Sequence, residues 1–99
     1  MDRTYIATIA HWTLQRREFD SGFHDYVVQA DDRRLPISLY VEDHANFETE
    51  SVEYTVTATP VSRQLDLDEL AEFAALVQEA TIAARTFQHL IETTEGRNS

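Results

Sequence analysis

The sequence contains no cysteine and no lysine, and it has only two glycines and two prolines in 99 residues. The absence of cysteine excludes disulfide bonds, thiol nucleophiles and cysteine-ligated zinc or iron–sulfur sites. The absence of lysine excludes Schiff-base catalysis and the lysine of a phosphate-binding loop. Gly22 and Gly96 alone cannot build a glycine-rich nucleotide loop. The sequence therefore predicts neither a thiol-dependent enzyme nor a common nucleotide-dependent one.

Long hydrophobic runs are also absent. The longest apolar run near the start, Tyr5–Ala10, contains Thr8 and follows Asp2 and Arg3. It is too short for a signal peptide or a membrane span. We therefore expect a cytoplasmic protein that does not enter a membrane.

Positive charge is scarce, since 18 acidic residues face 8 arginines and give a formal net charge of −10. A GC-rich genome and a salt-adapted cytoplasm would each explain part of this balance. The excess is nevertheless concentrated, because residues 42–79 hold ten acidic residues and a single arginine, Arg63. Such a chain repels the phosphate backbone. We expect no direct binding of DNA or RNA, and we expect that the acidic middle segment has a purpose.

The composition is that of a globular domain, with 42% hydrophobic and 10% aromatic residues. A chain of this length buries about two thirds of its unfolded surface, which suffices for a core without metal or disulfide bonds. We predict one α+β domain over residues 1–93 and a disordered C-terminal tail over residues 94–99.

Strand-like alternation of apolar and polar residues precedes a single helical pattern. The alternating segments, separated by turn-forming polar stretches, are residues 4–14, 23–30, 35–42 and 51–61. Asp66 stands three residues before Glu69, which is the spacing of an N-terminal capping box, and Gly96 is a stop signal. These signals predict a helix over residues 67–93.

Short turns favour antiparallel pairing of neighbouring strands, because parallel neighbours need crossover helices that this sequence lacks. One face of the sheet must then be covered, and only the C-terminal helix can cover it. We predict a four-stranded antiparallel meander covered on one face by a long helix, a ββββα two-layer sandwich.

Apolar residues recur along the predicted helix at alternating intervals of three and four. This helix seam consists of Leu70, Phe73, Val77, Ala80, Ala84, Phe87 and Ile91. One interpretation is that the whole seam packs on the protein's own sheet. However, about 26 helical residues span roughly 39 Å, more than most strands, and the two central alanines allow close approach of another backbone. We therefore predict a homodimer that uses the helix seam.

Two further surfaces are candidates for contact with a partner. The acidic ridge consists of Asp43, Glu48, Glu50, Glu53, Asp68, Glu72 and Glu79. It would attract a basic protein surface, although solvation alone also explains such residues. The outer sheet face consists of Tyr5, Ile9, His11, Tyr40, Thr55, Thr57 and Thr59. It would dock a second sheet or a partner, or simply face water.

Catalytic patterns are weak. The four histidines, His11, His24, His44 and His89, show no His-Glu-x-x-His or other ligand spacing, and no serine stands in a nucleophile-elbow pattern. We predict no catalytic residues, no metal and no cofactor. The leading hypothesis is a small acidic protein-interaction module, an adaptor, assembly factor or regulator. The alternatives are an acidic inhibitor of a nucleic-acid-binding protein, and an enzyme or small-ligand binder with a site between sheet and helix.

Overall fold

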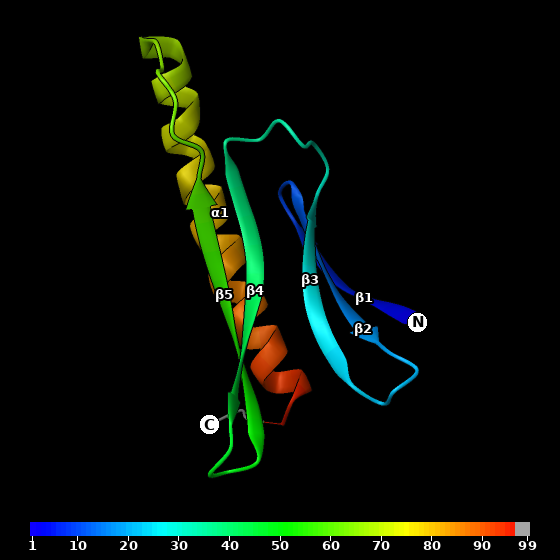
Figure 1. Ribbon diagram of the computed structural model, residues 1–99. Helices are drawn as coiled ribbons and strands as arrows, with labels where there is room; N and C mark the ends of the chain where they lie inside the picture. Colours follow the sequence, from blue (N-terminus) through cyan, green and yellow to red (C-terminus); the bar gives the residue numbers. More distant parts are fainter. Residues whose placement is uncertain (97–99) are drawn as a thin grey trace.

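The computed structural model describes residues 1–96 and confirms the α+β class (Figure 1). Five strands precede one helix, in the order β1 (Asp2–Ile9), β2 (Trp12–Glu18), β3 (His24–Ala30), β4 (Ile37–Asn46), β5 (Ser51–Pro60) and α1 (Leu67–Thr94). The molecule is elongated, with extents of 48 × 27 × 21 Å. The helix runs along this length, and its N-terminal turns extend past the end of β5 (Figure 1).

The strands form two antiparallel sheets, so the prediction of one four-stranded meander was wrong in this respect. Strands β1, β2 and β3 form the first sheet, and β4 and β5 form the second. Strand β3 lies beside β4, but no backbone ladder joins them within residues 1–96 (Figure 1). A side chain makes the link instead, because the Tyr54 hydroxyl donates to the carbonyl of His24 over 3.3 Å. The two sheets are therefore joined by side chains and by the helix.

The extra strand arises because the segment 4–14 is a hairpin rather than one strand. Ile9 pairs with Trp12, so Ala10 and His11 alone form the turn. Ala10 adopts a left-handed conformation with φ of 52°. This position usually holds glycine or asparagine, and neither is present here. The sequence therefore carried no local signal for the turn.

One hydrophobic core connects all layers. Its buried side chains come from every element except β1: Trp12, Leu14, Tyr26, Ile37, Leu39, Tyr54, Leu76, Ala80, Ala83, Phe87 and Ile91. The helix supplies five of these and packs against strands of both sheets. The helix is thus the element that holds the two sheets together.

Both ends of α1 carry defined caps. The predicted capping box is confirmed, since the Glu69 amide donates to Asp66 Oδ1 over 2.8 Å and the Asp66 amide donates to Glu69 Oε1 over 3.3 Å. At the other end Thr94 is still helical and Glu95 is the C-cap. Thr94 and Glu95 therefore belong to the helix and its cap and not to the predicted tail, and residues 97–99 of that prediction lie outside the described residues.

Candidate functional site: a cleft between two hairpin turns

The helix seam is divided between the interior and the surface. Its C-terminal part packs into the protein's own core and comprises Ala80, Phe87 and Ile91. Its remaining residues are exposed or half-buried and comprise Leu70, Phe73, Val77 and Ala84. The exposed fractions of Leu70 and Val77 are 51% and 41%, which are large for a regular apolar stripe. Only part of the seam is therefore available to a partner.

A groove of about 480 Å³, the helix groove, lies between this exposed part of the seam and the β4–β5 hairpin. Val56, Ala58 and Pro60 line it from β5, and Val77 and Ala84 line it from α1. Its walls are almost wholly apolar, with Thr81 and Arg85 as the polar members. Such a surface favours contact with another apolar surface over contact with water.

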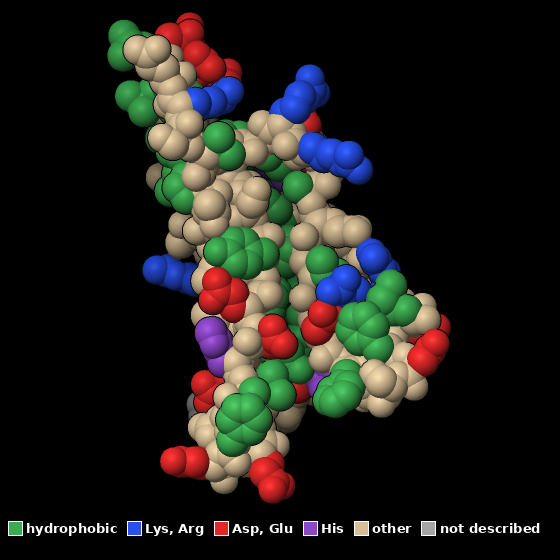
Figure 2. Space-filling model, in the orientation of Figure 1, with side chains coloured by type: hydrophobic (Ala, Val, Ile, Leu, Met, Phe, Trp, Pro, Cys, Tyr) green, Lys and Arg blue, Asp and Glu red, His purple; other side chains and the backbone are tan. Residues whose placement is uncertain are grey.

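The acidic ridge is not one surface. Asp43, Glu48, Glu50 and Glu53 lie on and beside the β4–β5 turn, near the C-terminal end of α1. Asp68, Glu72 and Glu79 lie in the N-terminal half of α1. Twenty helical residues span about 30 Å, so the two groups occupy opposite ends of the molecule. Figure 2 shows acidic side chains gathered at both ends.

The outer sheet face is also divided. On the second sheet Thr57 donates to the Tyr40 carbonyl over 3.4 Å, and Thr59 donates to the Tyr40 hydroxyl over 3.3 Å. Thr55 lies exposed on the same strand. These four residues form a continuous patch of hydroxyl groups.

The other three predicted members belong to the first sheet and its turn. Tyr5 is exposed on β1, whereas Ile9 packs against the core. His11 Nδ1 lies 3.2 Å from Asp31 Oδ2, and His11 Nε2 lies 3.7 Å from Glu79 Oε2. His11 therefore joins the first hairpin turn to the helix.

The strongest candidate site is a cleft of about 560 Å³ between the β2–β3 turn and the β4–β5 hairpin, the hairpin cleft. Phe19 and Phe23 line it from the first turn, and Glu50 and Val52 line it from the second. Glu95 reaches it from the end of α1. Figure 2 shows hydrophobic and acidic side chains side by side over both hairpins at this end.

Phenylalanines at these turns are unusually exposed. Phe23 is 76% exposed, and Phe47, at the tip of the β4–β5 turn, is 90% exposed. Arg17 already stacks its guanidinium 5.5 Å from the centre of the Phe19 ring, a cation–π contact. Several exposed rings at one end of a small protein mark an interaction surface more often than a single one does.

The carboxylates of the cleft fall into two kinds. Asp25 is paired with Arg17, which donates to both of its oxygens over 2.7 and 2.6 Å. Asp43 and Glu50 also line the cleft, and their side chains make no ion pair or hydrogen bond with any residue in the described range 1–96. The cleft therefore presents two uncompensated negative charges next to two aromatic rings.

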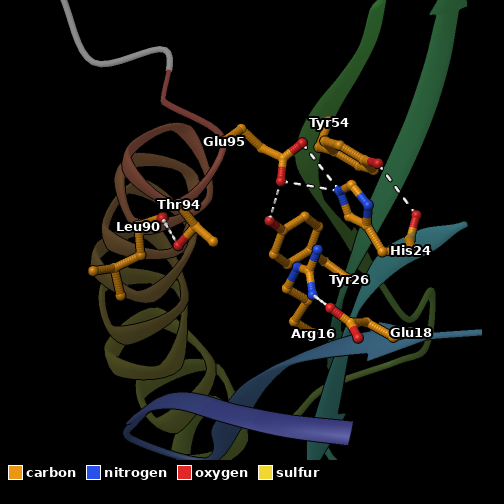
Figure 3. A network of polar contacts seen from close by, with 8 residues as sticks. All are labelled: Arg16, Glu18, His24, Tyr26, Tyr54, Leu90, Thr94 and Glu95. Carbon is orange, nitrogen blue, oxygen red and sulfur yellow. Dashed lines mark hydrogen bonds and ion pairs between the residues drawn. The ribbon is translucent and has the colours of Figure 1, made fainter. Parts of the chain in front are cut away.

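The inner wall of the cleft is a polar network centred on Glu95 (Figure 3). Tyr26 donates its hydroxyl to Glu95 Oε2 over 2.6 Å, and His24 Nε2 lies 3.1 and 3.0 Å from the two carboxylate oxygens. The Tyr26 and Tyr54 rings meet edge to face with centres 4.9 Å apart. Arg16, beside Tyr26, contacts Glu18. This network fixes the end of α1 against β3.

Titration of the network follows from its hydrogen bonds. Burial raises the pKa of Glu95, but the hydrogen bonds from Tyr26 and His24 outweigh it, so the pKa lies below its ordinary value. Burial, followed by the hydrogen bond to Glu95, raises the pKa of Tyr26. Glu95 is therefore an anion and Tyr26 a neutral donor at neutral pH. Catalysis by a hydroxyl nucleophile needs a serine or threonine hydrogen-bonded to a base such as histidine. Within residues 1–96, no hydroxyl of serine or threonine is hydrogen-bonded to His24.

Sequence reasoning missed the exposed phenylalanines and the Glu95 network. The first had a signal, because Phe19 and Phe23 flank the turn residues Asp20-Ser21-Gly22, and Phe47 lies in the polar segment 43–50. An aromatic residue among turn-forming residues is expected to be exposed, because a turn lies at the surface and away from the core. The second had none, since His24 and Glu95 are 71 residues apart.

Among the described residues, no group of three or more His, Asp or Glu side chains is arranged to hold a metal ion. No helix within residues 1–96 is long and apolar enough to span a membrane.

Comparison with known proteins gives no family for this chain, because no family model, no curated protein and no solved structure matches it.

Proposed function

We propose that this protein is a protein-interaction module that binds basic, partly apolar segments of another protein in the hairpin cleft and catalyses no reaction. The observation that supports this proposal is the pairing of free carboxylates with exposed phenylalanines around one concave surface. Asp43 and Glu50 would attract arginine or lysine side chains, and Phe23 would cover an apolar or planar neighbour. The cytoplasmic location of the protein remains a prediction from the sequence alone.

The charge of the whole chain supports a basic partner. A net charge of −10 raises the local concentration of cationic ligands and accelerates their encounter. The proposal is narrower than the hypothesis of an acidic inhibitor, because it restricts the contact with the basic partner to the hairpin cleft at one end of the molecule. A basic nucleic-acid-binding surface remains one kind of partner that would fit.

A titration with a synthetic peptide tests the proposal. The probe is an acetylated, amidated peptide in which arginine alternates with leucine, added to ¹⁵N-labelled protein and followed by NMR. We expect the largest shift changes in residues 19–25, 43–52 and 95, which line or flank the cleft. Shift changes spread evenly over all acidic residues would contradict the proposal.

A matched pair of variants separates the cleft from general charge. The double variant Asp43→Asn, Glu50→Gln removes two charges at the cleft, and Asp68→Asn, Glu72→Gln removes two at the other end of the molecule. Exposed ion pairs contribute about 0.2–1 kcal/mol each, so we expect the first variant, which loses two of them, to bind the peptide about two- to thirtyfold more weakly. The second should bind almost as wild type. Equal weakening by both variants would show that the cleft has no special role.

A further inference from the structure

We infer that the hairpin cleft selects arginine over lysine in its protein partner. The guanidinium group of the partner lies on the ring of Phe23, and Asp43 and Glu50 accept its hydrogen bonds. Because it concerns the same cleft, this selectivity rests on the proposed function. The observation that carries it is an arginine of this chain that is already held in the same way at the rim of the cleft.

Arg17 shows how the rim of the cleft holds a guanidinium group. Its Nε and Nη2 atoms donate to the two carboxylate oxygens of Asp25 over 2.7 and 2.6 Å. Its guanidinium carbon lies 5.5 Å from the centre of the Phe19 ring. Asp25 and Phe19 both line the hairpin cleft. One ring and one carboxylate therefore hold an arginine here through a bidentate ion pair and a cation–π contact.

A second set of the same groups lines the cleft without a cation. Phe23 lies opposite Phe19 at the base of the turn, because the Phe19 amide donates to the Phe23 carbonyl over 2.8 Å. Phe23 is 76% exposed, compared with 37% for Phe19. Asp43 and Glu50 line the cleft, and no described residue neutralises either carboxylate. Phe23 and these two carboxylates thus repeat the combination of groups that binds Arg17.

The register of the second sheet brings Asp43 to the wall opposite Phe23. Asp43 pairs with Tyr54 across the β4–β5 ladder, so both side chains project from the same face of that sheet. The Tyr54 hydroxyl donates to the carbonyl of His24, the residue that follows Phe23. This contact holds the end of the first hairpin beside the second sheet. The cleft between the two walls has a volume of about 560 Å³, which leaves room for a partner's side chain.

The shapes of the two cations decide between arginine and lysine. A guanidinium group is planar, stacks on aromatic faces and carries several donors in one plane, so it contacts a ring and carboxylates at the same time. The ammonium group of lysine is compact and more strongly hydrated, so it loses more on leaving water for a ring. Asp43 and Glu50 alone would attract both cations. The exposed ring of Phe23 therefore supplies the preference for arginine.

A pair of matched peptides tests this preference. The acetylated, amidated arginine–leucine peptide is compared with the same peptide in which lysine replaces every arginine, and both affinities are measured by calorimetric titration. We expect the arginine peptide to bind about two- to fivefold more tightly, which is the range that a cation–π contact at an exposed site supplies. In a ¹³C-labelled arginine peptide, the δ-methylene protons should shift upfield on binding, because they lie over the face of the ring.

The variant Phe23→Leu removes the ring and keeps an apolar side chain. Its circular dichroism spectrum should equal that of the wild type, since the ring is mostly exposed. We expect it to bind both peptides with similar affinity, through a loss of arginine binding and little change in lysine binding. Phe47→Leu is the control, because Phe47 is 90% exposed and lies outside the lining of the cleft. This variant should keep the preference of the wild type.

The possible failures are distinguishable. Equal affinity of the wild type for the two peptides, with NMR shift changes still confined to the cleft, would overturn the selectivity for arginine and leave the proposed function intact. An arginine preference that persists in Phe23→Leu would also overturn it. Binding of neither peptide at the cleft would overturn the proposed function and the selectivity together.

Discussion

Glu95 ties the end of the helix to the first sheet through its contacts with His24 and Tyr26. Its pKa in the folded protein lies below that of the unfolded chain, which is about 4.3 for glutamate. A carboxylate of this kind stabilises the fold fully above the unfolded value, and the stabilisation is lost as pH falls through the folded pKa.

We therefore expect Glu95→Gln to lower the melting temperature at neutral pH. The difference from wild type should shrink as the pH falls from about 4.3 through the lowered pKa of Glu95, because the wild-type side chain then becomes uncharged like glutamine. Thermal unfolding followed by circular dichroism over a pH series measures this. Glu72→Gln, on the exposed face of α1, is the control and should show no such convergence. A difference that stays constant with pH would mean that the charge of Glu95 contributes nothing.

The side chain of Gln88 forms hydrogen bonds with the backbone of β5 at the edge of the second sheet. Its side-chain oxygen accepts the Val56 amide over 2.8 Å, and its side-chain nitrogen donates to the Tyr54 carbonyl over 2.9 Å. It thus occupies the place that a further strand would take beside β5. Open strand edges invite pairing with other chains, and this contact protects one.

Gln88→Ala should destabilise the protein by about 1–2 kcal/mol, because two backbone groups lose partners in a half-buried place. Urea unfolding measures the loss, and hydrogen exchange of the Val56 amide should accelerate. Gln78→Ala, on the exposed face of the same helix, should change stability by less than about 0.5 kcal/mol. Similar losses in both variants would indicate a general helix effect.

Among the elements, the helix and the second sheet were predictable and the first hairpin was not. The capping box, the alternation in β5 and the polar turn before it are local signals, and each element formed where its signal lay. The β1–β2 turn depends on distant residues, since His11 contacts Asp31 and Glu79 and its carbonyl accepts the Asp31 amide over 2.9 Å. Contacts of this kind leave no pattern in the adjacent sequence.

The left-handed conformation of Ala10 offers a test at this level. Glycine adopts positive φ without steric cost, so Ala10→Gly should stabilise the protein by about 0.5–1 kcal/mol. Ala7→Gly, inside β1, should instead destabilise it by a similar amount, because glycine loses more conformational freedom in a strand. Chemical denaturation measures the free energy of unfolding of both variants. A loss of stability in Ala10→Gly would contradict the argument.

The division into two sheets also lay beyond local signals. A short connection between β3 and β4 favoured their pairing, as the prediction of a single meander assumed. The structure fills the junction with side chains instead, where the Tyr26 and Tyr54 rings meet and Tyr54 reaches the His24 carbonyl. Which pair of strands exchanges hydrogen bonds depends on this packing, and packing depends on the whole fold.

At the scale of the whole molecule, topology decides where charge gathers. The ten acidic residues of the segment 42–79 lie within one stretch of the sequence. In the fold, half of them lie on the β4–β5 hairpin, and the other half lie at the start and in the N-terminal half of α1. The sequence predicted the amount of acidic charge and a basic partner as one hypothesis. It could not place Asp43 and Glu50 beside Phe23, since that position requires the two sheets to meet.

Net repulsion should make the fold sensitive to salt. The chain carries −10, and charges are screened beyond about 10 Å at 0.1 M ionic strength. We expect the melting temperature to rise when sodium chloride is raised from low to about molar concentration. Differential scanning calorimetry measures the rise. A flat or falling melting temperature would show that paired charges outweigh the repulsion.

The position of the helix after both sheets has a consequence for synthesis of the chain. Until α1 is made, the inner faces of the sheets, with Trp12, Leu14 and Tyr54, have nothing to cover them. At about 5–20 residues per second, the 28 residues of α1 take the ribosome roughly 1.5–6 s. Hairpins form within about 10 μs. The nascent chain therefore waits as two open sheets, and the timing of translation decides whether its own helix or another molecule covers them first.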